Sequence, residues 1–227
     1  RWNYQQKLKI GINAEKDAGE PFFALKQKRG FDFYSGYIEI NDVSKTVKKV
    51  VVGEYALQFG QGILLWNGLS FGKGAWIGAV AKQGVGLRSY SSINENNFQR
   101  GIAASLKFNN MEWTPFVAYN KLSGNVEESD TSIFIHTINS SGLHRTPTEQ
   151  TYRDAIGQLV IGSDISYQYK RLKVGLTGLY TTFQGEILQA NAVRNQFDFE
   201  GKDLIQLVFT INIISEMSIF LVKQHIV

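Results

Sequence analysis

The side chains that could carry out chemistry in this sequence are few, and their spacing matches no metal site. Three histidines, His136, His144 and His225, lie in different segments, and the chain has no cysteine. Zinc in proteins normally takes three or four nitrogen or sulfur ligands at close range. A thiolate site is therefore excluded and a histidine site is not expected, so we predict no metal and no cofactor.

One loop, "INSSGLHRTPTEQTYRD" from Ile138, contains the groups that a serine hydrolase needs. His144 lies there close to Ser140, Ser141, Arg145 and Glu149, so a nucleophile, a base and an orienting group can be named. The stretch has no nucleophile-elbow sequence, and serine is common in loops of every kind. We therefore predict a structural loop network with no catalytic residue, and we keep hydrolysis as an alternative.

A second candidate is the glycine-rich stretch "FGQGILLWNG", which begins at Phe59. It lacks the Lys-Ser/Thr pair of a phosphate-binding loop and the spacing of a dinucleotide fingerprint. Gly60 and Gly62 are two residues apart, which places them on one face of an extended strand. We predict that they allow close packing of a bulky neighbour or a bend in the chain.

The composition favours strands as the elements that position these residues. Aromatic residues make up 13% of the 227 residues, with 22 Gly and only 3 Pro, a balance typical of strands joined by tight turns. The net charge of +4 is spread among acidic residues, so no nucleic-acid partner is expected. The longest apolar stretch, residues 74–81, is far shorter than the ~20 residues of a membrane-spanning helix.

Hydrophobic residues alternate with polar ones along several segments, which predicts half-buried strands. Examples are residues 5–13, 54–60 and 101–108. Two hairpins are predicted, with turns at Asn109-Asn110 and near Lys170-Arg171. The arms of the second hairpin are each about ten residues long, the length of a tilted membrane strand.

Alternation alone does not tell whether the apolar face meets a protein core or lipid. Three features favour lipid: the strands are long, the other face is rich in Gly, Ala, Ser, Thr and Gln, and aromatic residues gather at strand ends. Long irregular segments, predicted as loops, span residues 89–99, 123–132, 138–154 and 185–203. We predict one all-β domain over residues 1–227, an antiparallel transmembrane β-barrel of roughly 10–14 strands, with a soluble all-β fold as the alternative. The aromatic residues at the strand ends are Tyr4, Phe31, Phe33, Tyr34, Trp66, Trp113, Tyr167, Tyr169, Tyr180 and Phe183.

Several motifs resemble an outer-membrane β-barrel family of the Bacteroidota, whose members are usually named for a helix-hairpin-helix domain that precedes the barrel. The first matching stretch, "GEYALQFGQGILLWNGLSFGKG", has Glu54 where the family usually has Asp; its matching residues are Gly53, Tyr55, Phe59, Gly60, Gln61, Gly62, Leu65, Trp66, Phe71, Gly72 and Lys73. The second stretch matches at Arg88, Tyr90, Ser91, Glu95, Arg100 and Gly101. "KDAGEPFF", "GFDFYSGYIEI" and "GLHRTPTE" also resemble family segments.

The resemblance implies a bacterial outer-membrane location and no particular activity. Because no helix-hairpin-helix domain is present and the family has more strands, we expect this chain to be a segment of a longer barrel. We predict a non-enzymatic structural or interaction subunit of an outer-membrane complex for export, assembly or uptake. Its expected partners are outer-membrane lipid and lipopolysaccharide, and other outer-membrane or periplasmic proteins. The first alternative is a small-solute channel of porin type, and the second is an outer-membrane lipid or peptide hydrolase.

Six charged residues are the candidate site that follows from a narrow barrel. A charge on an inward position must be paired, because burying it alone costs several kcal/mol. We hypothesise a lumenal or rim ion-pair network that plugs the barrel or orders its loops, whereas a selectivity lining for a pore is the rival interpretation. The six residues are Glu54, Arg88, Glu95, Arg100, Arg145 and Glu149.

Overall fold

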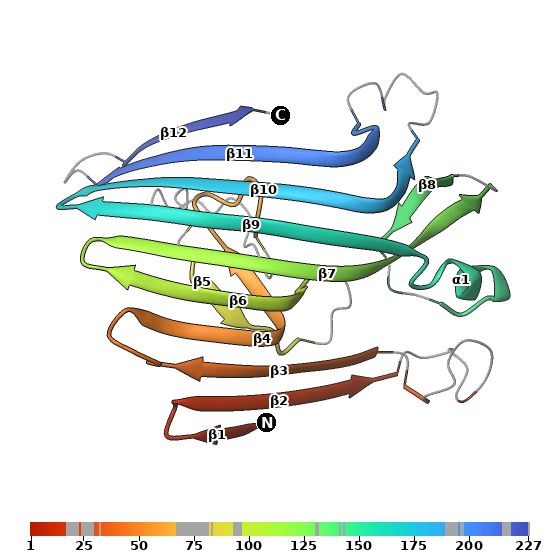
Figure 1. Ribbon diagram of the computed structural model, residues 1–227, viewed down its shortest axis with the longest axis horizontal. Helices are drawn as coiled ribbons and strands as arrows, with labels where there is room; N and C mark the ends of the chain where they lie inside the picture. The colour runs from red at the N-terminus through yellow and green to blue at the C-terminus, as the bar shows by residue number, and fades with distance from the viewer. Residues whose placement is uncertain are drawn as a thin grey trace.

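The computed structural model of the protein is almost entirely β-structure, with one short helix (Figure 1). It describes residues 1–16, 23, 30–31, 33–66, 82, 84–92, 97–129, 132–140, 142, 144–188, 195, 198–214 and 219–226. The elements are β1 (Trp2–Tyr4), β2 (Leu8–Glu15), β3 (Phe33–Asn41), β4 (Val47–Gln58), β5 (Gly86–Ser89), β6 (Gln99–Phe108), β7 (Met111–Glu128), β8 (Ile133–Asn139), α1 (Pro147–Tyr152), β9 (Ile156–Tyr169), β10 (Leu172–Ile187), β11 (Gly201–Ile214) and β12 (Ile219–Ile226). The predicted all-β class is confirmed.

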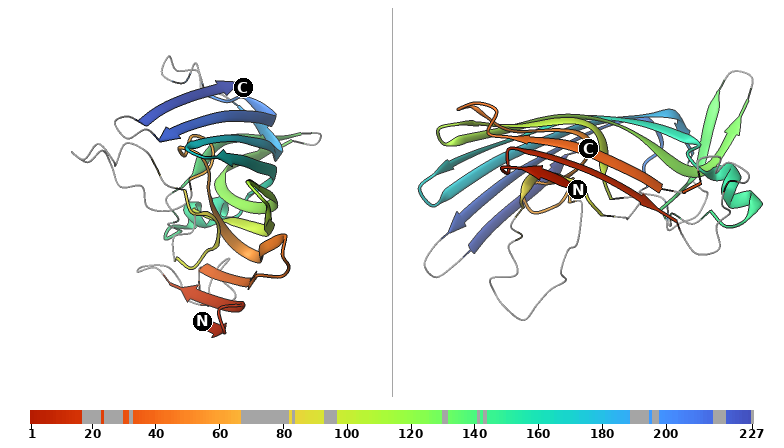
Figure 2. Two further views of the ribbon diagram at one scale, coloured as in Figure 1. Left: turned by 90° about the vertical axis from the view of Figure 1, so that its left-hand side faces the viewer. Right: turned by 90° about the horizontal axis from the view of Figure 1, so that it is seen from below.

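The strands form one sheet of 12 strands in nearly sequential order, β1-β2-β3-β4-β6-β7, then β10-β11-β12, with β5 paired to β4. Between β7 and β10 lie both β9 and β8, each paired with a different stretch of these two strands. β7 is long enough to pair with β9 over Met111–Leu122 and with β8 from Ser123 onward. The sheet is strongly curved, as a barrel wall is, with a convex and a concave face (Figure 2). β1 and β12 stand at the two ends of the strand order, and no pairing between them occurs among the described residues.

Short turns lie at one end of the sheet and long connections at the other (Figure 1). The turns at residues 5–7, 42–46, 109–110 and 170–171 join β1 to β2, β3 to β4, β6 to β7 and β9 to β10. Asn109 and Lys170 have positive φ values of 51° each, as the predicted hairpin turns at these two places require. We call the two ends the short-turn end and the long-loop end.

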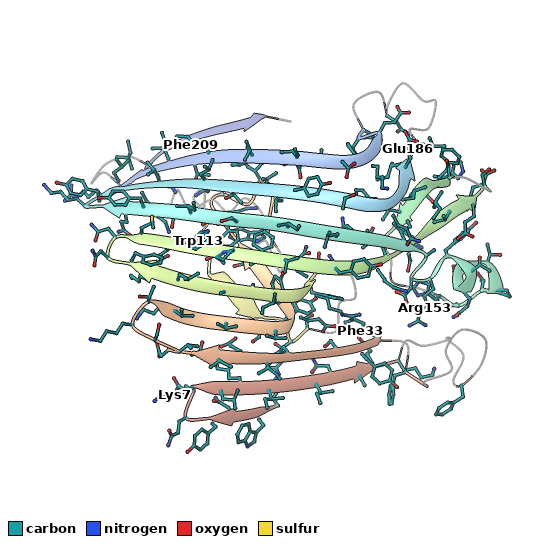
Figure 3. The ribbon with its side chains drawn as sticks, viewed as in Figure 1. Lys7, Phe33, Trp113, Arg153, Glu186 and Phe209 are labelled. Atoms are coloured by element: carbon teal, nitrogen blue, oxygen red, sulfur yellow. The ribbon has the colours of Figure 1, made fainter. Side chains whose placement is uncertain are left out.

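The convex face carries an apolar row that crosses nine strands by direct lateral pairing. Eight of its nine side chains are exposed, and Ile10 is half-buried. A parallel row closer to the short-turn end runs through Trp113, Ile165, Leu176 and Phe209; Trp113 and Phe209 are labelled in Figure 3. The first row consists of Trp2, Ile10, Ile38, Val52, Ile102, Val117, Ile161, Tyr180 and Ile205.

The concave face is built from small and polar residues with a few buried apolar ones, as the composition of the polar positions predicts. Six of its polar residues are buried: Glu39, Thr114, Asp164, Ser166, Thr177 and Thr210. At its centre the backbones come very close together. A Cβ atom on Gly101 would lie 2.1 Å from the Val117 carbonyl oxygen, and one on Gly53 would lie 2.2 Å from that of Gly36. Only glycine fits at these two positions.

Some predicted boundaries are wrong, because strands continue into stretches with loop-like composition. Residues 123–128 belong to β7, residues 138–139 to β8, residues 185–187 to β10 and residues 201–203 to β11. The polar Ser, Asn, Gly and Glu residues of these ends project beyond the apolar rows. They are tolerated there because lateral pairing with β8 and β11 satisfies their backbone groups.

Candidate functional site: a segment across the concave face

The most distinctive feature of the concave face is a stretch of chain that leaves the sheet and lies against its interior. β4 pairs with β3 as far as Gly53, whose φ is +100°. From Tyr55 to Gln58 it pairs with β5 instead. We call residues 54–66 and 84–90 the inner segment; Figure 2 shows β5 and the end of β4 beneath the curved sheet.

The inner segment is held by a hydrophobic core. Tyr55, Ala56 and Leu57 have no exposed surface at all, so the stretch 54–60, predicted to be a half-buried strand, is buried on both sides. The segment packs against side chains of β6, β7, β9 and β10. Complete burial of one such side chain is worth about 1.5–3 kcal/mol. The cluster comprises Tyr37, Val51, Tyr55, Leu57, Phe59, Leu65, Leu87, Ala103, Phe116, Ala118, Val160 and Leu179.

The glycine-rich motif forms the far end of this segment and reaches β11. Gly60 has a φ of +52°, and a Cβ atom there would lie 2.8 Å from Cγ2 of Thr210. The Gln61 side chain accepts a hydrogen bond from the Lys82 N–H at 2.9 Å and donates to the Lys82 carbonyl at 3.3 Å and to Asn212 Oδ1 at 3.2 Å. Through Gln61 the motif therefore contacts Lys82, which lies just before residues 84–90, and Asn212 in the opposite part of the sheet.

The prediction that Gly60 and Gly62 share one face of a strand is wrong, because both have positive φ and lie in a turn. Gly62 nevertheless allows the close packing of a bulky neighbour that the sequence predicts. A Cβ atom there would lie 2.9 Å from the Trp66 ring, over which the Lys82 ammonium sits at 4.8 Å from the ring centroid. Phe71, Gly72 and Lys73, which continue the family-like motif, lie outside the described residues.

Polar contacts fix the near end of the inner segment to the sheet. Glu54, almost completely buried, forms an ion pair with Arg100 at 2.5 Å and accepts a hydrogen bond from the Gly36 N–H at 3.1 Å. Lys49 donates to the Leu87 carbonyl at 2.9 Å, and the Ser89 N–H donates to Glu39 at 3.2 Å. These contacts join β5 and the end of β4 to charged and backbone groups of β3, β4 and β6.

Three of the six predicted charged residues lie in this region. Glu54 and Arg100 are paired directly, and Arg88 lies in β5 beside Ala56. Burial raises the pKa of the Tyr90 hydroxyl, and the charges of Glu54 and Arg88 act on that pKa in opposite directions. Glu54 and Arg88 therefore lie near one buried tyrosine, and Arg100 is joined to this group through its ion pair with Glu54.

The other predicted charges are not part of that group. Arg145 and Glu149 lie at α1, beyond the long-loop ends of β7 and β9 (Figure 1). The Glu149 carboxylate accepts hydrogen bonds from the N–H groups of Thr146 and Arg145, as in a capping box. These bonds lower the pKa of Glu149 below its usual value. Glu95 lies outside the described residues.

His144 has a partner that the sequence did not reveal. Its Nε2 atom lies 2.9 Å from Oγ of Ser123 in β7. The same Oγ accepts a hydrogen bond from the Asp154 N–H at 3.3 Å, and the Gln150 side chain donates to the His144 carbonyl. Ser140, which the sequence places near His144, is exposed, and Ser141 lies outside the described residues. Ser123 was missed because its stretch was predicted to be a loop.

The loop around His144 is packed against β7, and it places the imidazole beside the Ser123 hydroxyl. Glu149, one of the charged residues near His144 in the sequence, caps α1. His136 contacts Glu127 at 2.9 Å, and no group of side chains able to hold a metal ion occurs in the described part of the chain.

Comparisons with family models, curated proteins and solved structures find no match to this chain. The Bacteroidota barrel family therefore stays a prediction from the motifs. No helix among the described residues is long and apolar enough to cross a membrane. The two faces of the sheet and the inner segment are the features that bear on function.

Proposed function

We propose that this chain is the barrel domain of a bacterial outer-membrane protein of the Bacteroidota type, and that it serves as a non-enzymatic structural or interaction subunit. The observation that carries the proposal is the exposed apolar row across nine strands of the convex face. A soluble protein rarely leaves so continuous an apolar surface in water. Lipid is the partner that satisfies it.

The dimensions of the convex face fit a bilayer. Exposed tyrosines flank the apolar band on neighbouring strands: Tyr119 pairs with Leu159 near the long-loop end of β9, and Tyr167 lies near its short-turn end. The eight residue-to-residue steps from Leu159 to Tyr167 span about 26 Å along the strand. At a tilt of about 40° this corresponds to roughly 20 Å, close to the ~25 Å apolar band of outer-membrane barrels.

The inner segment favours a closed interior over an open channel. Its apolar core and its contacts with β4, β6 and β11 occupy the face that would line a pore. We propose that contact with other outer-membrane or periplasmic proteins takes place at the exposed loops and rim. In planar bilayers we expect no steady conductance from the protein, whereas steady ion-selective currents would support the channel alternative.

Lipid exposure can be tested with single cysteines, because the natural chain has none. Ile165→Cys places a label on the convex face, and Gln168→Cys places one on the exposed concave side of the same strand. After reconstitution, brominated lipids should quench a fluorophore at residue 165, and a water-soluble quencher should reach the one at 168. Equal aqueous quenching at both positions would disprove the membrane assignment.

The Ser123–His144 contact supports one second candidate, an acyl hydrolase at the long-loop rim. A hydroxyl within 2.9 Å of an imidazole nitrogen is the geometry of a nucleophile and its base. Ser123→Ala and His144→Ala would both abolish ester hydrolysis by the purified protein, and Ser140→Ala would leave it intact. Absence of hydrolysis by the wild-type protein on acyl esters and lipids would exclude this candidate.

A further inference from the structure

The described residues at the two ends of the sheet differ in charge. The four short turns, each taken together with three residues on either side, contain nine Lys and Arg residues and three Asp and Glu residues. At the long-loop end, the described residues 15–16, 121–129, 144–155 and 186–203 contain nine acidic and five basic residues. Lys7 marks the basic end in Figure 3, and Glu186 lies at the opposite end. An anionic ligand is therefore attracted to the short-turn end.

A pocket of about 260 Å³ opens at this basic end. It is formed by two neighbouring hairpins, β6–β7 and β9–β10, and it lies on the concave side. The strand register places the pocket on the concave side, because Lys107 pairs with Glu112, and Glu112 pairs with the buried Ser166 of that face. The lining residues are Lys107, Asn109, Asn110, Glu112, Ser166, Gln168, Lys170 and Lys173.

The lining is rich in hydrogen-bond donors and carries an excess of positive charge. Three ammonium groups face one carboxylate, Glu112, whose distance of 3.5 Å from Lys107 is that of a loose, exposed ion pair. The Lys170 ammonium lies 5.4 Å from the centroid of the Tyr169 ring, which is outside the lining, so it must leave that ring to contact a bound anion. Amide and hydroxyl groups of the remaining residues add neutral donors. Nothing else in the lining competes for the positive charge.

Three ammonium groups on separate strands and turns fit an anion with several oxygen atoms better than a carboxylate with two. The volume also exceeds what one small ion needs, since a water molecule takes about 30 Å³ in the liquid. We propose that this pocket binds a phosphate-bearing anion, with Lys107, Lys170 and Lys173 as the ligands of the phosphate group. The phosphate comes either from a lipid headgroup or from a free phosphorylated solute.

The test is titration of the detergent-solubilised protein with pyrophosphate by isothermal titration calorimetry. The triple variant Lys107→Gln/Lys170→Gln/Lys173→Gln removes the three ammonium groups. Each ammonium group contributes about five-fold to affinity through water-screened attraction at contact distance, so we expect a loss of roughly 100-fold. Succinate, a dicarboxylate, should bind the wild-type protein at least about ten-fold more weakly than pyrophosphate.

A matched control removes the same charge from the same end outside the pocket: Lys7→Gln/Lys45→Gln/Lys48→Gln. Its affinity should stay within about three-fold of the wild type, because distant exposed charges are screened. Equal losses in both triple variants, or no pyrophosphate binding by the wild type, would overturn the proposal. Thermal unfolding curves of both variants establish that each is folded.

The source of the phosphate is resolved by repeating the titration in lipid nanodiscs. If the pocket holds a headgroup phosphate, phosphatidylglycerol should weaken pyrophosphate binding relative to phosphatidylcholine, and only in proteins with the intact pocket. If it takes a free solute, the two lipids should give the same affinity. Because the first titration needs no bilayer, this site can fail or succeed independently of the proposed membrane location.

Discussion

The contact between the inner segment and β11 makes a sharp prediction at Gly60. Gly60→Ala introduces two separate costs: a side chain at a φ of +52°, and a Cβ atom 2.8 Å from Cγ2 of Thr210. The backbone cost is about 1–2 kcal/mol and the overpacking cost is about 1–3 kcal/mol. We expect a total loss of roughly 2–5 kcal/mol in the free energy of unfolding, measured with guanidinium in detergent micelles.

Two further variants separate these costs. Gly86 has a φ of +70° and open space around its Cα, so Gly86→Ala should show the backbone cost of about 1–2 kcal/mol alone. Thr210→Ser removes the Cγ2 atom but keeps the hydroxyl that bonds to the Gly175 carbonyl. Combined with Gly60→Ala, it should recover about 1–2 kcal/mol relative to the sum of the two single changes.

Strict additivity in this double-mutant cycle would refute the reasoning, because it would mean that residues 60 and 210 do not touch. An effect of Gly60→Ala no larger than that of Gly86→Ala would lead to the same conclusion. Either result would mean that Gly60 does not contact Thr210 of β11, and the proposal of a closed interior would lose the support of that contact.

Three other changes test the faces, the core and the helix cap. Ile165→Lys should prevent stable insertion into vesicles or cost about 2–4 kcal/mol there, whereas Gln168→Lys should insert normally, as protease protection would show. Tyr55→Phe should lower the free energy of unfolding by about 1 kcal/mol, since it removes the 2.9 Å hydrogen bond to the Val117 carbonyl. The pKa of Glu149 is lowered in the folded protein, so its contribution to α1 is present above the usual carboxyl pKa and is lost as pH falls through the lowered value. The protection of the α1 amides against exchange, taken relative to their intrinsic exchange rates at each pH, should therefore fall in acid, and Glu149→Gln should abolish that pH dependence.

Local sequence predicted the hairpins well because their determinants are local. Asn109 and Lys170 stand at the turns where positive φ is needed, and the alternation in the arms assigns each side chain to a face. The sequence also predicted that one face of the sheet is apolar and that the other is rich in small and polar residues. The all-β class follows from these features without any long-range information.

The inner segment could not be predicted in the same way. Residues 55–59 alternate as an exposed strand does, yet both of their sides are buried by chain that is distant in sequence. Gln61 meets Asn212, and His144 meets Ser123, through contacts that no local pattern encodes. The pairing of Glu54 with Arg100 was accessible because a buried charge demands a partner, although the sequence did not say which one.

The order of pairing in the sheet also bears on how the protein assembles. Strands that follow one another in the chain and pair directly form three blocks, β1–β4, β6–β8 and β9–β12. Two seams unite the blocks, where Val47 pairs with Leu106 and Met111 pairs with Tyr167. Closing each seam requires a long loop, so these steps are the slow ones. The inner segment belongs to the loop that closes the first seam. Its docking on the concave face therefore brings the ends of that loop together and lowers the entropy cost of pairing β4 with β6.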